Sequence, residues 1–505
     1  MSNNSTDLKK IISHCKEYGY VFPSSEIYDG LSACYDYGPF GVELKNNIKD
    51  YWWRSMVRLR LDVVGLDSSI FMHPDIWKAS GHVDAFNDPL IDNKDSKKRY
   101  RADQIVENYI DKIVAKVDKE IKKAEKRFGD NFNKNQFIKT SVRVQQNLKK
   151  INETKELLNK YLADEDFRSL KKLIEDIGVV CPVSGTSNWT DIRKFNLMFS
   201  TKIGSVADQA SQLYLRPETA QGIFVNFLSV QKTARMKIPF GIAQIGKAFR
   251  NEIIARQFIF RMREFEQMEM QFFVKPGQEM SWFDYWKAER KKWHNTIGFN
   301  DDVLKFHDHE NLAHYANAAT DIEFKFPFGF KELEGIHSRT DFDLRSHERH
   351  TNKKLQYFDS EINDHYTPYV VETSIGLDRM FLAVLCNSYK EEPIKDGIRT
   401  VLNLPPILAP FKIAILPLVK KDNLPDKSKE IYNKLKSNFS CYYEEKDSIG
   451  KRYRRQDALG TPFCVTIDHE TLDNDTVTLR YRDSMDQVRT SIDELIITIN
   501  NKLTI

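Results

Sequence analysis

The stretch that decides the fold is "FRNEIIARQFIFRMREFEQMEMQFF", residues 249–273. It places four arginines and four glutamates among side chains that are otherwise apolar enough for a protein core. In a strand, successive side chains point to opposite faces, so one face can be charged while the other is buried. We therefore expect two strands joined by the loop "IIARQ", residues 253–257, in an antiparallel hairpin with a charged front and a mostly apolar back.

Strand alternation predicts which side chains share the charged front. In "AQIGKAFRNE" these are Gly246, Ala248, Arg250 and Glu252, with Ile245, Lys247 and Phe249 opposite. In "FRMREFEQMEMQFF" they are Arg261, Arg263, Phe265, Gln267, Glu269 and Gln271, with Met268, Met270 and Phe272 behind. The charges of the other parity, such as Glu264 and Glu266, receive no role from this argument.

Two interpretations of the charged front remain open. One is a solvated sheet face with cross-strand ion pairs. The other is a nucleotide site, because arginine forks match phosphate oxygens, flat side chains sandwich a purine, and a carboxylate accepts from an amine. The mixture of arginines, a phenylalanine and glutamates on one face favours the nucleotide site.

Length and composition limit the remaining possibilities. A chain of 505 residues suggests two to four domains around a substantial core. The net charge of +4 means that a nucleic-acid partner would have to meet local basic patches. The six cysteines have no disulfide-framework spacing, and we find neither an apolar signal core nor a run of about 18 apolar residues. We expect a cytoplasmic protein that neither is secreted nor binds a membrane.

The segments around the hairpin suggest the domain organisation. Apolar spacing predicts a helix over Val42–Val57 and then a strand in "LDVVGLDSSIFMHP", residues 61–74. Residues from about 95 to 176 are rich in Lys and Asn and read as a solvated helical insertion or as a basic arm on a nucleic-acid backbone. After a proline-rich linker, residues 408–505 alternate strand-like and helical runs, which indicates a separate α/β domain.

The segment "YVVETSIGLDRMFLAVL", residues 369–385, reads as a strand, a glycine break and a helix. Glu372 and Ser374 would share a strand face. The buried helix stripe would be Leu377, Phe381, Val384 and Leu385. Arg379 falls in the first helical turn, where the helix dipole disfavours a cation unless an anion lies near. Either a bound polyphosphate supplies that anion or the arginine turns to solvent.

A third element is "LYLRPETAQGIF", residues 213–224, in which Pro217 occupies the expected first helical position. Glu218 beside it would by default compensate the helix dipole.

Three elements in order, the helix and strand ending at Pro74, the hairpin with "FRNE" and "GLDR" at the start of a helix, resemble the three signature motifs of class II aminoacyl-tRNA synthetases. More narrowly, "YDYGPFGVELKNNIKDYWW", "PDIWKASGHVDAFNDPL", "LRPETAQGIF", "GIHSRTDFDL" and "VVETSIGLDR" resemble the dimeric, single-chain type of glycyl-tRNA synthetase. The resemblance covers almost the whole chain. It implies an α+β catalytic domain on an antiparallel sheet, residues 1–405, with a helical insertion, and an α/β anticodon-binding domain, residues 408–505.

The resemblance also implies the ATP-binding residues. Arg250 would hold the α-phosphate and the amino-acid carboxylate, Glu252 the adenine amine, and Arg263 and Arg379 the outer phosphates, with Phe265 and Arg379 on the adenine faces. Arg250, Glu252 and Arg379 would be catalytic, and Glu332 would lie near ATP and its Mg²⁺. The implied ATP-binding set is Arg250, Asn251, Glu252, Phe260, Arg261, Met262, Arg263, Glu264, Phe265, Glu332, Leu333, Gly376, Leu377, Asp378 and Arg379.

For glycine, the resemblance implies a cage in which Glu218, Glu269 and Glu372 surround the ammonium group. Such a pocket can reject every larger amino acid through a clash with its Cβ, so no editing segment is required. The implied glycine-binding set is Arg101, Glu218, Phe265, Glu266, Gln267, Met268, Glu269, Arg339, Glu372, Thr373, Ser374, Ile375 and Gly376.

Two further expectations concern metal and RNA. Many members of the family carry paired cysteines where this chain has Asn93, Ser96 and Ser184, with only Cys181 remaining, so we expect no structural zinc. The histidines of "HERH" and "HDH" are more typical of surface or packed side chains than of ligands. In the anticodon-binding region, the resemblance favours contact between RNA and the basic residues of "GKRYRRQD", although such clusters are often only solvated surface. These residues are Lys451, Arg452, Arg454 and Arg455.

Three functions remain to be separated. The first is an ATP-dependent ligase that joins glycine to tRNA(Gly), with a homodimer implied by the first motif. The second is a non-catalytic RNA-binding relative, and the third is a synthetase for another amino acid. The retained set Arg250, Glu252, Arg263 and Arg379 speaks against the second, and the three-glutamate cage speaks against the third.

Overall fold

The computed structural model describes residues 7–129, 132–204, 211–253, 257–310, 312, 316–395 and 397–503. The chain forms two compact units. The larger contains residues 1–80, 199–250 and 255–505, and the smaller contains residues 81–198 and 251–254. In the part of the chain that is described, no helix is both long and apolar enough to cross a membrane.

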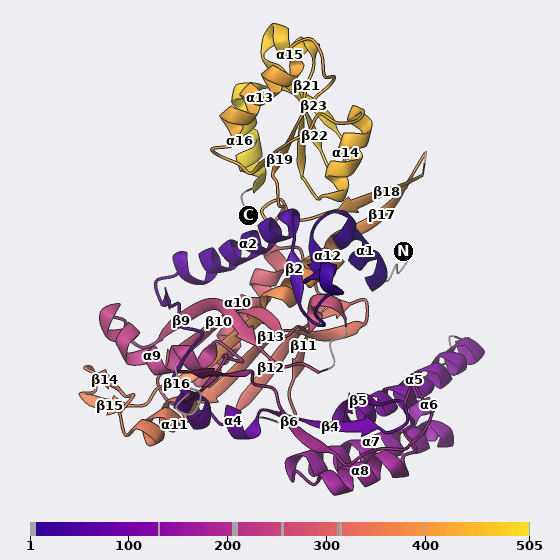
Figure 1. Ribbon diagram of the computed structural model, residues 1–505, viewed down its shortest axis with the longest axis vertical. Coiled ribbons are helices and arrows are strands. Elements are labelled where there is room, and N and C mark those ends of the chain that lie inside the picture. The colour runs from indigo at the N-terminus through magenta and orange to yellow at the C-terminus, as the bar shows by residue number, and fades with distance from the viewer. Residues whose placement is uncertain are drawn as a thin grey trace. The chain divides into compact units, whose positions relative to one another are not determined.

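A seven-stranded sheet forms the centre of the larger unit (Figure 1). Its strand order is β11-β12-β13-β16-β10-β9-β3, and every neighbouring pair is antiparallel except β3 and β9. The strands are β3 (Val63–Gly65), β9 (Phe240–Phe249), β10 (Glu264–Val274), β11 (Leu304–Asp308), β12 (Ala318–Phe326), β13 (Gly329–Thr340) and β16 (Tyr369–Gly376). This confirms the expected antiparallel fold class.

The predicted hairpin is confirmed, but its strands are shorter than expected. β9 and β10 pair antiparallel, with Phe265 opposite Ala248 and Glu269 opposite Gln244. β9 ends at Phe249, so Arg250 lies beyond it, and the connection contains the short helix η5 (Phe258–Phe260). The predicted loop was therefore too short, and its residues 254–256 lie outside those described.

One face of the sheet carries the main core, made by Met268, Met270 and Phe272 of β10 with three helices. These helices are α2 (Pro39–Trp53), α10 (Glu279–Thr296) and α12 (Leu377–Ser388). α2 continues into a π-helical turn, η2 (Arg54–Arg58), as the pattern over 42–57 predicted. α12 is buried well beyond the predicted stripe, because Met380, Leu382 and Ala383 are also inaccessible.

The opposite face of the sheet is polar at one end and apolar at the other. At the apolar end, Phe240 of β9 and Phe273 of β10 pack on Phe227 of α9 (Ala220–Thr233). α9 begins three residues after Pro217, so the prediction that Pro217 is the first helical residue was wrong. The strand predicted over 61–74 is also shorter, since only Val63–Gly65 pairs as a strand.

Small elements complete the part of this unit that precedes residue 405. They are α1 (Leu8–Glu17), β1 (Val21–Pro23), η1 (Glu26–Tyr28), β2 (Tyr35–Tyr37), α3 (Pro74–Ala79), β7 (Ser200–Ile203), β8 (Ser211–Tyr214), α11 (Phe342–Thr351), β14 (Tyr357–Asp359), β15 (Asp364–Tyr366), β17 (Tyr389–Ile394) and β18 (Gly397–Leu402).

The C-terminal part of the same unit is an α/β domain, as predicted. Its sheet has the order β20-β19-β21-β22-β23, with β19 parallel to both β20 and β21. The strands are β19 (Ile413–Pro417), β20 (Cys441–Tyr443), β21 (Phe463–Ile467), β22 (Thr476–Tyr481) and β23 (Gln487–Ser491). The helices are α13 (Leu424–Leu435), α14 (Ile449–Ala458), α15 (His469–Asn474) and α16 (Ile492–Leu503).

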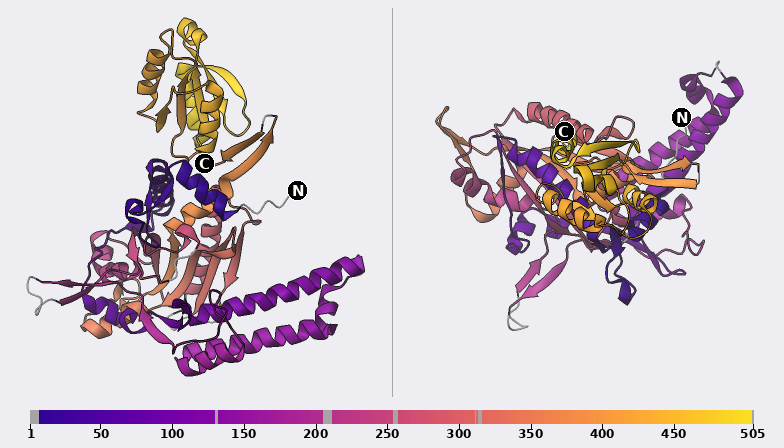
Figure 2. Two further views of the ribbon diagram at one scale, coloured as in Figure 1. Left: turned by 45° about the vertical axis from the view of Figure 1, so that its right-hand side comes forward. Right: turned by 90° about the horizontal axis from the view of Figure 1, so that it is seen from above.

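The smaller unit confirms the predicted helical insertion. It contains α4 (His82–Ala85), a sheet of order β5-β4-β6, and the helices α5 (Ala102–Phe128), α6 (Lys134–Thr140), α7 (Val142–Ala163) and α8 (Phe167–Asp176). The strands are β4 (Asn87–Asn93), β5 (Lys98–Arg101) and β6 (Arg193–Asn196). Figure 2 shows α5 and α7 side by side, joined by a core that includes Ile113, Val117 and Ile151.

Candidate active site

The polar end of the large sheet gathers carboxylates from two neighbouring strands. Glu269 of β10 lies opposite Ser374 of β16, and Gln271 lies opposite Glu372. Because residues of one parity share a face, all four side chains stand on the same side of the sheet. Glu269 is buried with 2% exposure, and Glu372 with 5%.

Gln271 joins the two carboxylates. Its Nε2 donates to Oε1 of Glu269 and to Oε2 of Glu372, each at 2.6 Å. Thr219 also donates a hydrogen bond from its hydroxyl to Glu269. Burial raises the pKa of Glu269 well above its ordinary value, and the charges of Glu372 and Glu218 raise it further. Glu269 is thus hydrogen-bonded by neutral groups, and its raised pKa favours the protonated form.

Glu372 has charged partners. Burial alone would raise its pKa, but Arg339 and His337 outweigh burial and hold the pKa at about 2. Nη1 of Arg339 lies 3.1 Å from Oε2 of Glu372, and Nδ1 of His337 lies 2.8 Å from Oε1. Arg339 is itself fixed by two hydrogen bonds to Asp343, at 2.8 and 3.0 Å. Glu372 therefore remains ionised at neutral pH.

The third glutamate lies just before α9. Oε1 of Glu218 accepts a hydrogen bond of 3.0 Å from Nε2 of Gln221, which also donates to Asp343 at 3.1 Å. Glu218 is near enough to raise the pKa of Glu269. The structure thus brings Glu218, Glu269 and Glu372 into one electrostatic environment, with Arg339 bonded to Glu372.

Gly246 keeps the neighbouring strand close to a buried arginine. A Cβ at this position would lie 2.3 Å from Nη2 of Arg216, which no side chain could accommodate without a shift. Arg216 donates to the backbone carbonyls of Lys247 at 2.6 Å and Ser68 at 2.8 Å. Gln244, on the same face, accepts a hydrogen bond of 2.9 Å from the Ser68 hydroxyl. These bonds fix the backbone beside the polar end of the sheet face.

Arginines lie at the edge of this floor, where the two hairpin strands end. The backbone N–H of Arg250 donates to the carbonyl of Arg263 at 2.9 Å, so the paired chains continue past the strands. The Arg250 guanidinium lies 5.3 Å from the centre of the Phe265 ring and donates from Nε to Pro217 at 3.1 Å. Nη1 of Arg263 donates to the carbonyl of Ser32 at 3.0 Å.

Arg379 lies in the first turn of α12, as predicted, and an anion lies beside it. Its Nη1 is 3.0 Å from Oε2 of Glu332, and its Nε donates to the carbonyl of Phe260 at 3.3 Å. The charge of Arg379 lowers the pKa of Glu332. Its guanidinium also lies 4.5 Å from the centre of the Phe260 ring. In the structure, a glutamate thus occupies the role that the sequence argument gave to a polyphosphate.

Several predicted site residues point away from this floor. Glu266 pairs with Lys45 at 2.7 Å, and Asp378 pairs with the same lysine at 2.8 Å. Asp378 also accepts from the backbone N–H of Glu266 at 2.8 Å. Glu264 pairs with the exposed Lys247. Buried side chains of the implied set, which belong to the core or face the opposite side of the sheet, are Phe260, Met262, Met268, Leu333, Thr373, Ile375 and Leu377.

Of four further predicted residues, two lie at the ends of elements in the larger unit and two lie in the smaller unit. Gly376 is the N-cap of α12, and Arg261 follows η5. In the smaller unit, the N–H of Asn251 donates to the carbonyl of Leu197 at 2.7 Å. Arg101 pairs with Asp103 at 2.6 Å and Asp88 at 3.2 Å, and these acids together with Glu252 of the same unit raise its pKa although burial opposes the shift.

The residues that replace the family's cysteines also lie together in the smaller unit. Sγ of Cys181 is 3.3 Å from the Ser96 hydroxyl and 3.2 Å from that of Tyr100. Ser184 donates to Oδ1 of Asn93 at 2.8 Å. Hydroxyls and one amide thus surround the single thiol, and the expectation of no structural zinc stays a prediction.

The four basic residues of α14 differ in their exposure to solvent. Arg452 is 2% exposed and donates to the carbonyls of Pro417 at 2.6 Å, Leu418 at 3.1 Å and Glu444 at 3.2 Å. Lys451 and Arg454 are exposed, and Arg455 is half-buried. The guanidinium of Arg452 therefore binds the protein's own backbone.

The sequence argument missed most of the residues that support the cage. It placed Gln271 on the correct face without giving it a role, and it overlooked Thr219, Gln221, His337 and Asp343. Strand alternation from Arg339 would have indicated His337, and "RPETAQG" contains both Thr219 and Gln221. Their contacts to the carboxylates depend on rotamers and on elements far apart in sequence.

Comparison with protein-family models gives three matches that together span most of the chain. Residues 88–197 match the glycyl-tRNA synthetase insertion domain 1. Residues 199–389 match the tRNA synthetase class II core domain (G, H, P, S and T). Residues 412–502 match an anticodon binding domain.

Full-length relatives give the same result. The chain is 49% identical over 483 residues to the glycine–tRNA ligase of Chlorobaculum tepidum, covering 95% of this chain and 97% of that protein. It is 48% identical over 493 residues to the glycine–tRNA ligase of Staphylococcus haemolyticus, covering 97% of each chain. The glycine–tRNA ligase of Staphylococcus aureus is 49% identical over 493 residues, again with 97% of each chain covered.

Proposed function

Since the chain belongs to the glycine–tRNA ligase family of class II aminoacyl-tRNA synthetases, we propose that its polar sheet face is the pocket for glycine. The enzyme is an ATP-dependent ligase. It activates glycine with ATP to glycyl-adenylate and transfers the glycyl group to the 3′ end of tRNA(Gly).

The observation that carries this assignment is the pair of buried carboxylates bridged by one amide. Gln271 stands between Glu269 and Glu372, at 2.6 Å from each, and an ammonium group offers the same carboxylates stronger, charge-assisted hydrogen bonds. With Glu218 the pocket holds three carboxylates. Binding the cation relieves their mutual repulsion, so a small amine is the ligand that this electrostatic environment favours.

For glycine we propose the following contacts: Arg101, Glu218, Phe265, Glu266, Gln267, Met268, Glu269, Arg339, Glu372, Thr373, Ser374, Ile375 and Gly376. Carboxylate contacts come from Glu218, Glu269 and Glu372, while residues whose side chains face the core would contribute backbone only. Such a pocket would reject larger amino acids through a clash with their Cβ.

For ATP we propose that Arg250, Glu252 and Arg379 are the catalytic residues. Arg250 would orient the α-phosphate for in-line attack by the glycine carboxylate, and Phe265 with Arg379 would hold the adenine. The arginines stabilise the charge that develops on the phosphates, so no nucleophilic side chain is needed. The remaining proposed contacts are Asn251, Phe260, Arg261, Met262, Arg263, Glu264, Glu332, Leu333, Gly376, Leu377 and Asp378.

Mg²⁺ is the metal that this reaction calls for, and Glu332 is the residue we propose for it. The Glu332 carboxylate is half-exposed and ionised beside Arg379, and carboxylate oxygens together with substrate phosphates are the ligands that Mg²⁺ prefers. When bound, the ion would neutralise charge on the phosphates of ATP.

We further propose a division into a catalytic domain, residues 1–405 with its insertion at about 95–176, and an anticodon-binding domain, residues 408–505. Lys451, Arg454 and Arg455 would contact tRNA, whereas the burial of Arg452 favours a structural role for it. We also propose that the protein assembles as a homodimer and resides in the cytoplasm, as the family resemblance implies. The six free cysteines are compatible with a reducing compartment.

ATP–pyrophosphate exchange, measured with each amino acid in turn, tests the proposal. Glycine should support exchange, and alanine and serine should not. Exchange with alanine or serine but not with glycine would overturn the glycine assignment, and no exchange with any amino acid would indicate a non-catalytic relative.

A matched pair of variants tests the cage itself. Glu269→Ala should raise KM for glycine and leave KM for ATP nearly unchanged, because Glu269 faces the proposed amine and not the nucleotide. Glu310→Ala, which removes an acid from a loop outside the proposed site, is the control. An equal loss of glycine and ATP use in Glu269→Ala would argue against the assigned role.

A further inference from the structure

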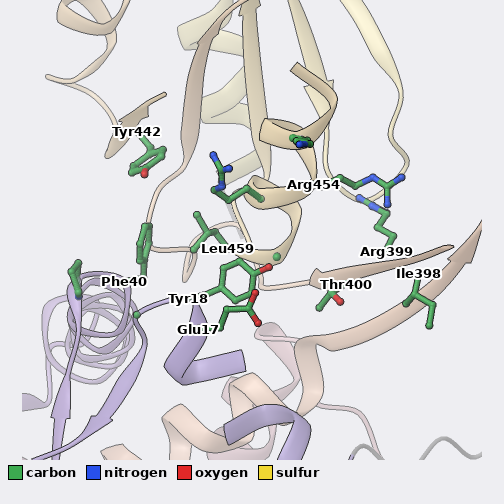
Figure 3. Close-up of a pocket in the computed structure, with 14 residues that line it drawn as sticks. Glu17, Tyr18, Phe40, Ile398, Arg399, Thr400, Tyr442, Arg454 and Leu459 are labelled. Carbon is green, nitrogen blue, oxygen red and sulfur yellow. The ribbon is translucent and has the colours of Figure 1, made fainter. Parts of the chain in front are cut away.

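A pocket of about 690 Å³ is lined by residues that do not belong to the carboxylate cage (Figure 3). Its walls come from the end of α1, the start of α2, β18, β20 and α14, all within the larger compact unit. This volume is typical of a site for a small ligand or one nucleotide.

Buried hydrogen bonds hold the walls together. Nε2 of His14 lies 2.9 Å from the carbonyl of Ala458, and the Tyr20 hydroxyl donates to the carbonyl of Leu459 at 2.9 Å. Nε of Arg399, a side chain that is only 1% exposed, donates to Asp457 at 2.8 Å. Because these bonds are shielded from water, they fix α14 against α1 and β18.

Aromatic rings form part of the wall. Figure 3 shows the rings of Tyr442 and Phe40 on one side, with Tyr18 at the centre. The centres of Phe40 and Tyr442 are 5.8 Å apart, and Tyr18 stacks on His14 with centres 4.5 Å apart. All three rings are half-buried, so each keeps part of its surface for a ligand.

Uncompensated cations form the wall above them. Lys451 and Arg454 lie three residues apart on α14, which puts them on one side of the helix. Both are exposed, and neither side chain forms an ion pair with any residue that the structure describes. Arg455, by contrast, is paired with Asp447 at 2.7 Å and with Glu444.

We propose that this pocket binds a nucleotide, with its phosphate on Lys451 and Arg454 and its base against the aromatic rings. Cations recognise phosphate, and every base presents a flat face that stacks on an aromatic side chain. Glu17, at the edge of the pocket, can accept a hydrogen bond from an exocyclic amine of the base. The N-terminal helices and the C-terminal domain together supply these cations, rings and carboxylate.

The nucleotide can come from two sources, an unpaired position of bound RNA or a free nucleotide. The RNA source rests on the proposed function, because that function makes tRNA a substrate. It extends that function by bringing Tyr18 and Phe40, which precede the catalytic sheet in the chain, into RNA recognition. The chemistry of the pocket itself does not depend on glycine activation.

The test compares the full-length wild type with two double variants. Lys451→Ala/Arg454→Ala removes the pocket cations, and Lys429→Ala/Lys436→Ala removes two exposed cations from α13 and its C-cap as a control. The probe is a tRNA(Gly) transcript, and the dissociation constant is measured by fluorescence anisotropy over a range of salt concentrations. Thermal unfolding shows whether each variant is folded.

For RNA, we expect the pocket variant to bind about tenfold more weakly or worse, and the control to change by less than about threefold. The slope of log K against log salt should fall by about one to two in the pocket variant, because up to two phosphate contacts are lost. Tyr18→Leu keeps the apolar volume but removes the ring, so it should weaken binding by about fivefold or more with an unchanged slope.

A second arm uses free AMP and CMP, whose binding to wild type and variants is measured by isothermal titration calorimetry. Binding of a mononucleotide that is lost in the pocket variant supports the site with a free nucleotide as ligand, even when RNA binding is unchanged. Unchanged RNA affinity and salt slope together with no mononucleotide binding would overturn the proposal. Failure of glycine-dependent exchange in the wild type would overturn the proposed function alone and leave the mononucleotide result standing.

Discussion

Arg379 and Arg452 occupy equivalent places in their two domains, yet their surroundings differ completely. Each lies in the first turn of a helix that follows a strand, α12 for Arg379 and α14 for Arg452. Arg379 is partly exposed and faces Glu332, a carboxylate that a ligand can compete with. Arg452 is 2% exposed and donates to the backbone carbonyls of Pro417, Leu418 and Glu444.

The difference shows what decides the role of a cation at a helix start. A cation there is unfavourable for the helix dipole, so it needs an acceptor. Where the protein backbone supplies fixed acceptors, the arginine stabilises the fold. Where the acceptor is one partly exposed carboxylate, the guanidinium can exchange this partner for a substrate.

The largest effect should follow from Arg379→Ala. We expect glycine-dependent ATP–pyrophosphate exchange to fall about 10²- to 10³-fold, the usual cost of removing one donor that stabilises transition-state charge. The melting temperature should change little, because the side chain is partly exposed. Arg349→Ala, an exposed arginine of α11, is the control. A large drop in melting temperature in Arg379→Ala would make the two arginines alike.

Arg452→Ala should show the opposite pattern. Loss of the guanidinium leaves the carbonyls of Pro417, Leu418 and Glu444 without their donor in a buried place, which costs about 3 kcal/mol of unfolding free energy. This corresponds to a factor of about 150 in the folding equilibrium. Denaturant unfolding measures the loss of unfolding free energy, and hydrogen exchange measures the loss of local protection in β19 and α14. Weaker RNA binding without any loss of stability would contradict the structural assignment.

The same contrast applies to two carboxylates and predicts a pH dependence. Glu372 is matched by Arg339 and His337, and with a pKa of about 2 it is ionised throughout an ordinary assay range. Glu269 has a raised pKa, so below that pKa an incoming ammonium must displace a proton. Glycine affinity should therefore rise with pH, by at most about tenfold per unit, and level off above the pKa of Glu269.

Glu269→Gln separates the two carboxylates. An amide cannot release a proton, so KM for glycine should be higher and should lose its pH dependence over that range. The groups around Glu269 are Thr219, Gln271, Glu372, Glu218 and Arg339. Exchange assays at several pH values measure KM for glycine. A slope that persists in Glu269→Gln would point to another titrating group, such as His337, whose pKa is raised by Glu372 against the effect of burial.

The smallest effect is expected for a charge that is compensated but exposed. Lys247 pairs with Glu264 across the hairpin, and both side chains are about half exposed. Lys247→Ala should lower the unfolding free energy by about 0.5 kcal/mol or less, since water and salt screen such pairs. Urea unfolding at low and high salt measures this loss. A loss above about 1.5 kcal/mol would show that exposure is a poor guide to the role of a charge in this sheet.

The sequence predicted the parts of the site that follow from local periodicity. The hairpin, the shared face of Glu269 and Gln271, and the position of Arg379 in the first helical turn all depend on spacing along one segment. They could be predicted because alternation in a strand and the start of a helix are local properties.

Other features could not be predicted because they depend on distant acceptors. Arg452 and Arg454 are separated by one residue, yet only Arg452 meets the carbonyls at the end of β19. The partner of Arg379 is Glu332, from a strand 47 positions away in the chain. Arg250 lies beyond its strand, where no alternation rule applies, and its backbone pairing with Arg263 is a tertiary property.

The chain passes between the two compact units four times rather than twice, because residues 251–254 belong with residues 81–198. Excising residues 81–198 and closing the gap with a linker would consequently not remove the smaller unit. It would leave behind a fragment whose Asn251 N–H has lost the Leu197 carbonyl that it bonds at 2.7 Å. In an engineered deletion, this second crossing has to be redesigned together with the first, since the excision otherwise damages the connection next to Arg250.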